Sequence, residues 1–378
     1  LCTQNIPTPI MNPDVGNKPE DFFKTVLYDG NGSTKTVTGI EFQPDFVWVK
    51  SRSNSYGHNI HDSIRGPDSY LSSHNTLAEN TDYANICVLN SNGFSLSSDN
   101  SGNVSGTTNV AWCWRAGGAP SGATSATGSA KRINTSGTQD DTSCDALATA
   151  TSATITPTLM SINQQVGFSI VKYTGTGSAA TIPHGLSKAP EWVIIKVLNV
   201  DGYNWVVYHN GLSGMNTKRL VLDTPAAASD QASGPWNSTS PTNTVVHIGT
   251  HLNVNSNTKN FIMYCWHSVP GYSAFGSYTS NGSTDGPFVY TGFRPAWVMC
   301  KGVNASSYWV IHDNARDGYN GNNKDLYAAL PQADASSNMI DILSGGFKIR
   351  NTTNEINGSG SYIYMAFAEQ PINYANAR

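Results

Sequence analysis

The stretch FQPDFVWVK, at residues 42–50, returns twice along the chain in similar form, as KAPEWVIIK at 188–196 and FRPAWVMCK at 293–301. Each copy joins a proline, an aromatic residue, an apolar run and a final lysine. Short apolar runs rich in Val, Ile and Trp are typical of β-strands, and proline is tolerated at a strand's start, where its missing N–H costs little. The chain therefore repeats one predicted strand three times, and the sequence on either side of each copy indicates which fold the strands form.

Further landmarks recur in the same order around each copy. The turn sequences YDGNGS, YTGTGS and YTSNGS stand upstream and begin at Tyr28, Tyr173 and Tyr278. Downstream, each unit closes on an aromatic run, VAWCW at 110–114, FIMYCW at 261–266 and YIYMAF at 362–367. The shared order indicates internal duplication of a unit of about 100 residues.

Each unit carries the signals of an antiparallel sandwich. Short apolar runs alternate with Gly, Asn, Ser and Asp clusters, and no segment keeps the periodicity of a long amphipathic helix. A unit of this length can hold its own core. The sequence therefore predicts an all-β protein of three tandem antiparallel β-sandwich repeats, lectin-like or jelly-roll-like. The expected parts are an extended N-terminal arm at 1–21, repeats at 22–118, 166–270 and 271–378, and an Ala/Thr/Ser-rich low-complexity linker at 119–165.

Large aromatic residues are expected to fill the core of each repeat. The residues assigned to it are Trp48, Trp192, Trp297, Trp114, Trp266 and Phe367. The lysines that close the repeated strand, Lys50, Lys196 and Lys301, are expected to reach water with their ammonium groups. A second interpretation stays open, in which tryptophan and lysine together form a sugar-stacking platform.

Composition excludes several classes of partner. Only 13% of the 378 residues are charged, and the formal net charge is −4. Because the chain has no basic excess, we expect no nucleic-acid partner. Because no apolar run approaches the roughly 18–20 residues that span a bilayer, we expect no membrane insertion. None of the six cysteines forms a C-x-x-C pair. Buried free thiols are therefore favoured over a zinc site, and nothing demands a disulfide framework.

The candidate catalytic residues form no consistent pattern. His58, His61 and Asp62 cluster in HNIHD, and His312 with Asp313 repeats the pair, but the second unit has Tyr208 and His209 at that place. His247 and His251 sit four apart, which on one strand would separate them by about 13 Å. We therefore expect no metal, no cofactor and no enzymatic activity, although carboxylates paired in space for glycoside hydrolysis stay open.

Together these residues resemble the repeat unit of large structural proteins of tailed bacteriophages, especially marine ones. The similarity is carried by YDGNGSTKTVTGIEFQPDFVWVKSRS at 28–53, by the second unit's NWVVYHNGL and by the third unit's YIYMAFAEQP, and it spans nearly all of 22–371. The resemblance implies a virion component, tail-fibre-like or lectin-like in fold, whose partners are copies of itself and other virion proteins. It carries over no catalytic or binding residues.

Three functional hypotheses follow. The first is a non-enzymatic structural protein in the virion, exposed as a fibre or appendage component and binding host-surface glycan through loop tyrosines, for which we select Tyr56, Tyr203 and Tyr319. The second is a capsid or neck decoration protein without receptor binding. The third is a secreted carbohydrate-binding protein or glycanase. By analogy with phage fibres, a symmetric trimer is expected on the particle.

Overall fold

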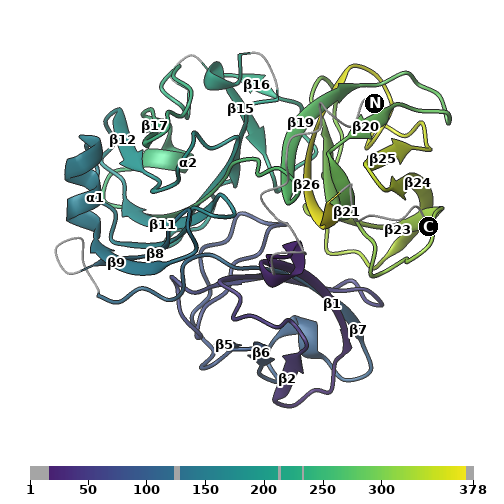
Figure 1. Ribbon diagram of the computed structural model, residues 1–378, viewed down its shortest axis with the longest axis horizontal. Helices are drawn as coiled ribbons and strands as arrows, with labels where there is room; N and C mark the ends of the chain where they lie inside the picture. Colours follow the sequence, from purple (N-terminus) through teal and green to yellow (C-terminus); the bar gives the residue numbers. More distant parts are fainter. Residues whose placement is uncertain (1–16, 123–127, 212–213, 232–233, 372–378) are drawn as a thin grey trace.

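The computed structural model describes residues 17–122, 128–211, 214–231 and 234–371, and within them the chain is all-β, as predicted. Figure 1 shows three lobes: a purple one below, a teal one on the left and a green-to-yellow one on the right. We refer to them as the first block (η3 to β7), the second block (β8 to β18) and the third block (β19 to β26). No helix in the described ranges is long and apolar enough to cross a membrane.

The first block consists of two small antiparallel sheets. One has the strand order β1-β7-β3-β4 and the other β2-β6-β5. Its elements are η3 (Pro19–Asp21), β1 (Phe23–Asp29), β2 (Lys35–Thr38), β3 (Phe46–Ser51), β4 (Asn59–Asp62), β5 (Cys87–Asn90), β6 (Gly93–Leu96), η4 (Ser101–Asn103) and β7 (Thr108–Trp114).

The second block has a nine-stranded sheet, of order β16-β15-β14-β13-β18-β11-β10-β8-β9, and a small sheet of β12 with β17. Its elements up to β13 are β8 (Ser129–Ile133), β9 (Gln139–Ser143), α1 (Cys144–Thr151), β10 (Leu159–Asn163), β11 (Phe168–Thr174), β12 (Ala180–Pro183) and β13 (Trp192–Val197). The remainder are β14 (Val206–His209), η5 (Met215–Thr217), β15 (Lys218–Val221), β16 (Ser229–Asp230), β17 (Val245–Ile248), α2 (Leu252–Asn255) and β18 (Asn260–Trp266).

The third block is one eight-stranded sheet of order β19-β26-β21-β22-β23-β24-β25-β20. Its strands are β19 (Ser273–Thr279), β20 (Phe288–Tyr290), β21 (Phe293–Gly302), β22 (Val310–Asp313), β23 (Asn322–Tyr327), β24 (Ala335–Leu343), β25 (Gly346–Ile349) and β26 (Ser361–Pro371).

One strand order recurs in all three blocks: β1-β7-β3-β4, β11-β18-β13-β14 and β19-β26-β21-β22. The register recurs as well, because Phe46 lies opposite Trp114, Trp192 opposite Trp266, and Trp297 opposite Phe367. Phe46, and not Trp48, is therefore the first-block counterpart of Trp192 and Trp297. Trp48 itself is buried two residues further along the same strand.

The repeated turn sequences form the same local structure. Each landmark tyrosine donates its hydroxyl hydrogen to a backbone carbonyl late in its block: Tyr28 to Gly102 (2.8 Å), Tyr173 to Val254 (2.6 Å) and Tyr278 to Ile356 (2.7 Å). A fully buried asparagine then fixes each Gly-Ser turn through its amide, namely Asn103, Asn255 and Asn357. A buried amide that satisfies a turn's carbonyl avoids the cost of an unpaired group, which explains why this element is repeated.

The segment at 119–165 differs from the expected linker. It contains β8, β9, α1 and β10, and β10 pairs antiparallel with β11 and parallel with β8. Met160 and Ile162 on β10 are fully buried, and Ser143 caps α1. The sequence did not predict these elements because small polar residues dominate the segment. For example, β9 alternates exposed and half-buried positions without any apolar side chain. Of the predicted N-terminal arm, residues 1–16 lie outside the described residues and η3 occupies part of the rest.

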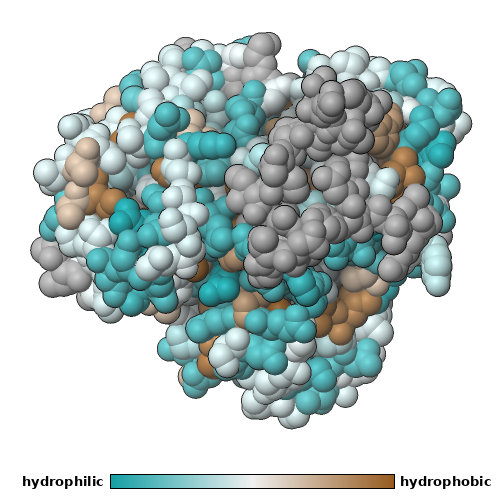
Figure 2. All heavy atoms as spheres, viewed as in Figure 1, coloured by the Kyte–Doolittle hydropathy of each residue, from teal (hydrophilic) through white to brown (hydrophobic). Residues whose placement is uncertain are grey.

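The three blocks share one hydrophobic core instead of each packing alone. A single buried cluster takes residues from every block, and smaller clusters lie within the first and third blocks. Rings meet across the boundaries: Phe46 and Trp266 (centroids 6.2 Å apart), Trp192 and Phe275 (5.8 Å), and Trp114 and Trp297 (5.7 Å). The face in Figure 2 is mostly hydrophilic or neutral with small hydrophobic patches. All nine tryptophans are buried.

Candidate functional site

The side chain just before β4, β14 and β22 links each block to another. In every case a ring N–H donates to a backbone carbonyl of a different block: His58 Nε2 to Tyr327 at 2.9 Å, Trp205 Nε1 to Ser72 at 2.9 Å and Trp309 Nε1 to Val221 at 2.7 Å. His58 can donate from Nε2 because its Nδ1 accepts the Trp48 indole N–H at 2.8 Å. The links run from first to third, second to first and third to second, and therefore close a ring.

The three repeated lysines are buried, so the prediction that they reach water is wrong. Each Nζ is held by backbone carbonyls, for example Lys301 by Ser307 at 2.7 Å and Lys196 by Tyr203 at 2.7 Å and Thr76 of the first block at 3.2 Å. Burial lowers the pKa of Lys50, Lys196 and Lys301 to about 8. Because these lysines and the repeat tryptophans are inside the protein, they form no sugar-stacking surface.

The histidine and carboxylate pairs that suggested chemistry serve the same ring. The Tyr264 hydroxyl of the second block donates to Asp62 of the first at 2.6 Å, and the Trp112 indole of the first donates to Asp313 of the third at 2.9 Å. His209 Nε2 donates to the Tyr364 carbonyl of the third block at 3.1 Å. These groups are fully buried and already bonded, which suits positioning rather than proton transfer to a substrate.

The remaining histidines form no metal site. His251 is the N-cap of α2 and lies 3.1 Å from Arg219, whereas His247 is on β17. Burial lowers the pKa of His61 to about 3, so this imidazole is neutral at ordinary pH. Across the described ranges, no group of three or more His, Cys, Asp or Glu side chains is placed to hold a metal ion.

The structure does not gather the three candidate glycan tyrosines. Tyr56 and Tyr203 occupy corresponding loop positions in the first and second blocks, both half-buried, and Tyr203 packs against the shared core. Tyr319 is in the third block, on the loop after β22, and is 81% exposed. None of these tyrosines lines the two hollows described next.

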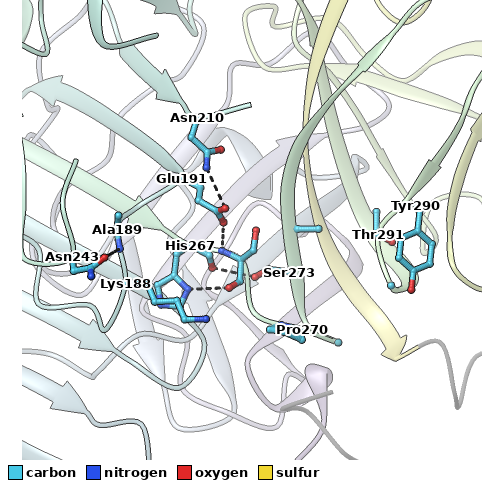
Figure 3. A pocket seen from close by; sticks show the side chains of 14 residues that line it. Lys188, Ala189, Glu191, Asn210, Asn243, His267, Pro270, Ser273, Tyr290 and Thr291 are labelled. Atoms are coloured by element: carbon cyan, nitrogen blue, oxygen red, sulfur yellow. Dashed lines mark hydrogen bonds between the residues drawn. The ribbon is translucent and has the colours of Figure 1, made fainter. Parts of the chain in front are cut away.

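A hollow of about 600 Å³ lies between the second and third blocks (Figure 3). Glu191, Asn210, His267 and Lys188 stand on one side of it, and Tyr290 with Thr291 stands on the other. Glu191 immediately precedes β13 and His267 immediately follows β18, so the paired central strands of the second block position the polar side. The third block supplies the opposite side from β20.

A second hollow, of about 450 Å³, lies between the first and second blocks and is strongly polar. Its lining includes His74, Glu79 and Asp201. Asp201 accepts the Ala78 backbone N–H at 2.6 Å, and burial raises the pKa of Glu79. The bond between Ala78 and Asp201 lies at the same boundary between the first and second blocks as the bond from Lys196 to Thr76.

Sequence reasoning missed Glu191, His267 and Tyr290. One signal was present: within the thrice-written motif, the position after proline is Asp45, Glu191 or Ala296, and so varies in charge and length. Because the rest of the motif is repeated, a residue that differs among the three copies indicates a position with a different role in each block. His267 and Tyr290 carried no comparable signal.

Fold and contacts define an all-β protein of three blocks with a common strand order, closed by buried polar links around one aromatic core. The chain belongs to the family described as a domain of unknown function (DUF7483), whose model matches residues 18–140 and 141–371. The first matched segment holds the first block together with β8 and the start of β9, and the second holds the rest of the second block and the third block. No curated protein matches the chain.

Proposed function

We propose that this chain is a non-enzymatic structural protein of a phage virion, exposed on the particle as part of a fibre or appendage. The partners are other copies of the chain and other virion proteins, and the particle surface presents a glycan-binding face to the host. In this proposal the three blocks are copies of one antiparallel sandwich module. The observation that carries it is the ring of links between blocks.

The ring of links between the blocks supports an architectural role, because the histidine and aspartate side chains that could do chemistry bond one block to another instead. The carboxylates of Asp62 and Asp313, with the arginines three residues later, are fully buried ion pairs. Breaking a buried pair leaves an uncompensated charge, so each pair holds its carboxylate where it accepts the bond from Tyr264 or Trp112 of another block. A rigid body with polar exposed loops is well suited to repeated display on a particle, where many weak contacts add up.

The experiment that tests this proposal is localisation. Antibodies against the purified chain should label intact particles in electron microscopy, at the fibre or appendage. Labelling on the capsid or neck would favour the decoration-protein alternative. Absence of the chain from purified particles would contradict both, and release of sugar from a polysaccharide by the pure chain would favour the glycanase alternative.

A further inference from the structure

We propose that the hollow between the second and third blocks binds a neutral saccharide of one or two rings, held between Glu191 and Asn210 on one side and Tyr290 on the other. This gives a site to the glycan binding of the proposed function and rests on that part of it. It also moves the binding away from Tyr56, Tyr203 and Tyr319.

The Glu191 carboxylate is held in place at the hollow. One of its oxygens accepts the backbone N–H of Ser268, and the other accepts the Asn210 side-chain amide at 3.2 Å. The Asn210 backbone N–H also donates to the Glu191 carbonyl, at 2.8 Å. Each carboxylate oxygen keeps a further lone pair, and the amide oxygen of Asn210 is an acceptor beside them. Adjacent acceptors of this kind match two neighbouring sugar hydroxyls.

His267 adds a fixed neutral ring to the same side. It is 3% exposed, and its Nδ1–H donates to the Ser268 carbonyl at 3.0 Å. The other ring nitrogen, Nε2, therefore carries the lone pair, which accepts the Ser187 hydroxyl hydrogen at 3.5 Å. Burial lowers the pKa of His267, so the ring stays neutral where a hydroxyl ligand would meet it.

Tyr290 supplies the aromatic side. It is on β20, a strand that pairs only with β25 in the described sheet, and it is 37% exposed. Phe288, two residues earlier on the same strand face, is 45% exposed. A sugar has an apolar face of C–H groups and hydroxyls around its edge. In this hollow the C–H face can stack on the exposed aromatic ring while the hydroxyls donate to the fixed polar acceptors opposite.

Size and charge select the ligand class. Ligand sites commonly measure about 300–1,000 Å³, and the hollow of about 600 Å³ falls within that range. Among its described lining residues, Lys188 and Glu191 are the charged side chains, so their charges balance. A balanced lining favours a neutral ligand over a phosphate or an acidic sugar. Glycoside hydrolysis uses two carboxylates across the bond, and this described lining provides one.

The other blocks show that Glu191 is used differently from its counterparts. Asp45 in the first block is 2% exposed and accepts the backbone N–H of Ala116 at 2.7 Å and of Gly118 at 3.2 Å. Ala296 in the third block has no carboxylate at all. The second block alone combines a longer, half-buried carboxylate with a hollow that has an exposed tyrosine across from it.

The test uses the full chain and saturation-transfer NMR with methyl glycosides of glucose, galactose and mannose, N-acetylglucosamine, and glucuronate as the acidic comparison. At least one neutral sugar should bind in preference to glucuronate. Tyr290→Ala should weaken that binding roughly tenfold, as expected for loss of an aromatic contact. Glu191→Gln should weaken it at least as much. Tyr319→Ala, which removes a more exposed tyrosine from the same block, is the matched control and should change nothing.

Two results would overturn the inference, and they have different consequences for the proposed function. If Tyr319→Ala abolishes sugar binding and Tyr290→Ala does not, the chain binds glycan elsewhere and only this site is wrong. If none of these sugars binds at concentrations of tens of millimolar, the saccharide assignment fails, while particle labelling still decides the virion role. Because Tyr290 is exposed, its alanine variant should melt like the wild type, which separates lost binding from lost folding.

Discussion

The three buried lysines show what a single residue contributes to this fold. An ammonium taken out of water loses hydration that backbone carbonyls replace only in part, and the pKa of Lys301 accordingly falls from 10.5 to about 8. Each lysine holds the carbonyls of a loop in its own block, and Lys196 and Lys301 also hold a carbonyl of another block. These bonds fix the loops and join the blocks, but burying the charged ammonium group lowers the stability of the folded chain.

The first prediction follows from that lowered pKa. Between pH 8 and 10.5 the unfolded chain keeps a proton that the folded Lys301 has released, so this group's contribution to stability rises with pH. Relative to Lys301→Met, the wild type should therefore gain up to about 2 kcal/mol between pH 7.5 and 9.5. Urea unfolding of both proteins at the two pH values measures this difference.

The matched control for the lysine prediction is Lys324→Met. The Lys324 ammonium bonds the Ser336 hydroxyl at the surface, at 3.1 Å, so its replacement should give no such pH-dependent difference. Comparing variants at each pH cancels the titration of the buried cysteines and tyrosines, which is common to all three proteins. An equal pH response in Lys301→Met and wild type would contradict the lowered pKa.

A second prediction concerns the bond between Tyr264 and Asp62. Tyr264→Phe removes the hydroxyl that donates to the buried carboxylate at 2.6 Å and leaves Arg65 as its side-chain partner. Loss of a hydrogen bond to a charged group should lower the free energy of unfolding by about 1.5–3 kcal/mol. Tyr203→Phe removes a half-buried hydroxyl and is the control in the same urea titration. Equal stability of the two variants would show that the bond joins the blocks only weakly.

At the scale of elements, the segment 119–165 shows the largest difference from the predicted structure. Its strands β10 and β8 extend the sheet beyond β11, so a stretch with linker composition covers what would otherwise be an open edge. Composition alone missed it, because most of the segment consists of Ala, Thr, Ser and Gly and the apolar residues of β10 form only one short run. The segment nevertheless supplies apolar residues to the core, namely Ala130, Cys144, Ile155, Leu159, Met160 and Ile162.

The third prediction tests whether this extension is a structural part of the protein. Met160→Ala should destabilise the chain by about 2–5 kcal/mol, because Met160 is fully buried on a paired strand. In hydrogen exchange, the amides of β10 should be protected to a degree similar to those of β11. Rapid exchange throughout 159–163, with β11 protected, would show that the segment behaves as a linker after all.

At the scale of the whole molecule, the ring of polar links joins the three blocks, and we expect them to unfold as one cooperative unit. Phe46, Trp192 and Trp297 occupy equivalent positions on a central strand of their blocks, and each meets an aromatic residue of the next block. A block on its own would expose these rings to water. Figure 1 shows the three blocks as three lobes, which the ring of links joins within one chain.

The fourth prediction is a single unfolding transition. Differential scanning calorimetry should give one peak for the full chain, and Trp297→Ala should move the whole peak down, with a loss of about 3–5 kcal/mol. Three independent sandwiches would instead give separable peaks, of which this substitution would move one. Leu252→Ala changes a side chain that is 61% exposed and is the control, with little effect expected.

The sequence by itself determined the local features: the β class, the thrice-written strand with its proline entry, the landmark tyrosines and the aromatic closing strands. These are encoded within short windows, where apolar runs, turn residues and repetition are directly visible. Pattern could also select the tryptophans as large apolar residues that need covering.

Only the tertiary structure decided how the units meet. Contacts such as His58 with Tyr327 or Trp112 with Asp313 join residues 269 and 201 positions apart, and no periodicity announces them. The same holds for the lysines, whose burial depends on carbonyls brought by separate loops, and for Glu191 and Tyr290, which face one hollow only because two blocks close upon it. Local pattern fixes which residues prefer a strand, whereas the partners across a boundary are set by packing three sheets around a common centre.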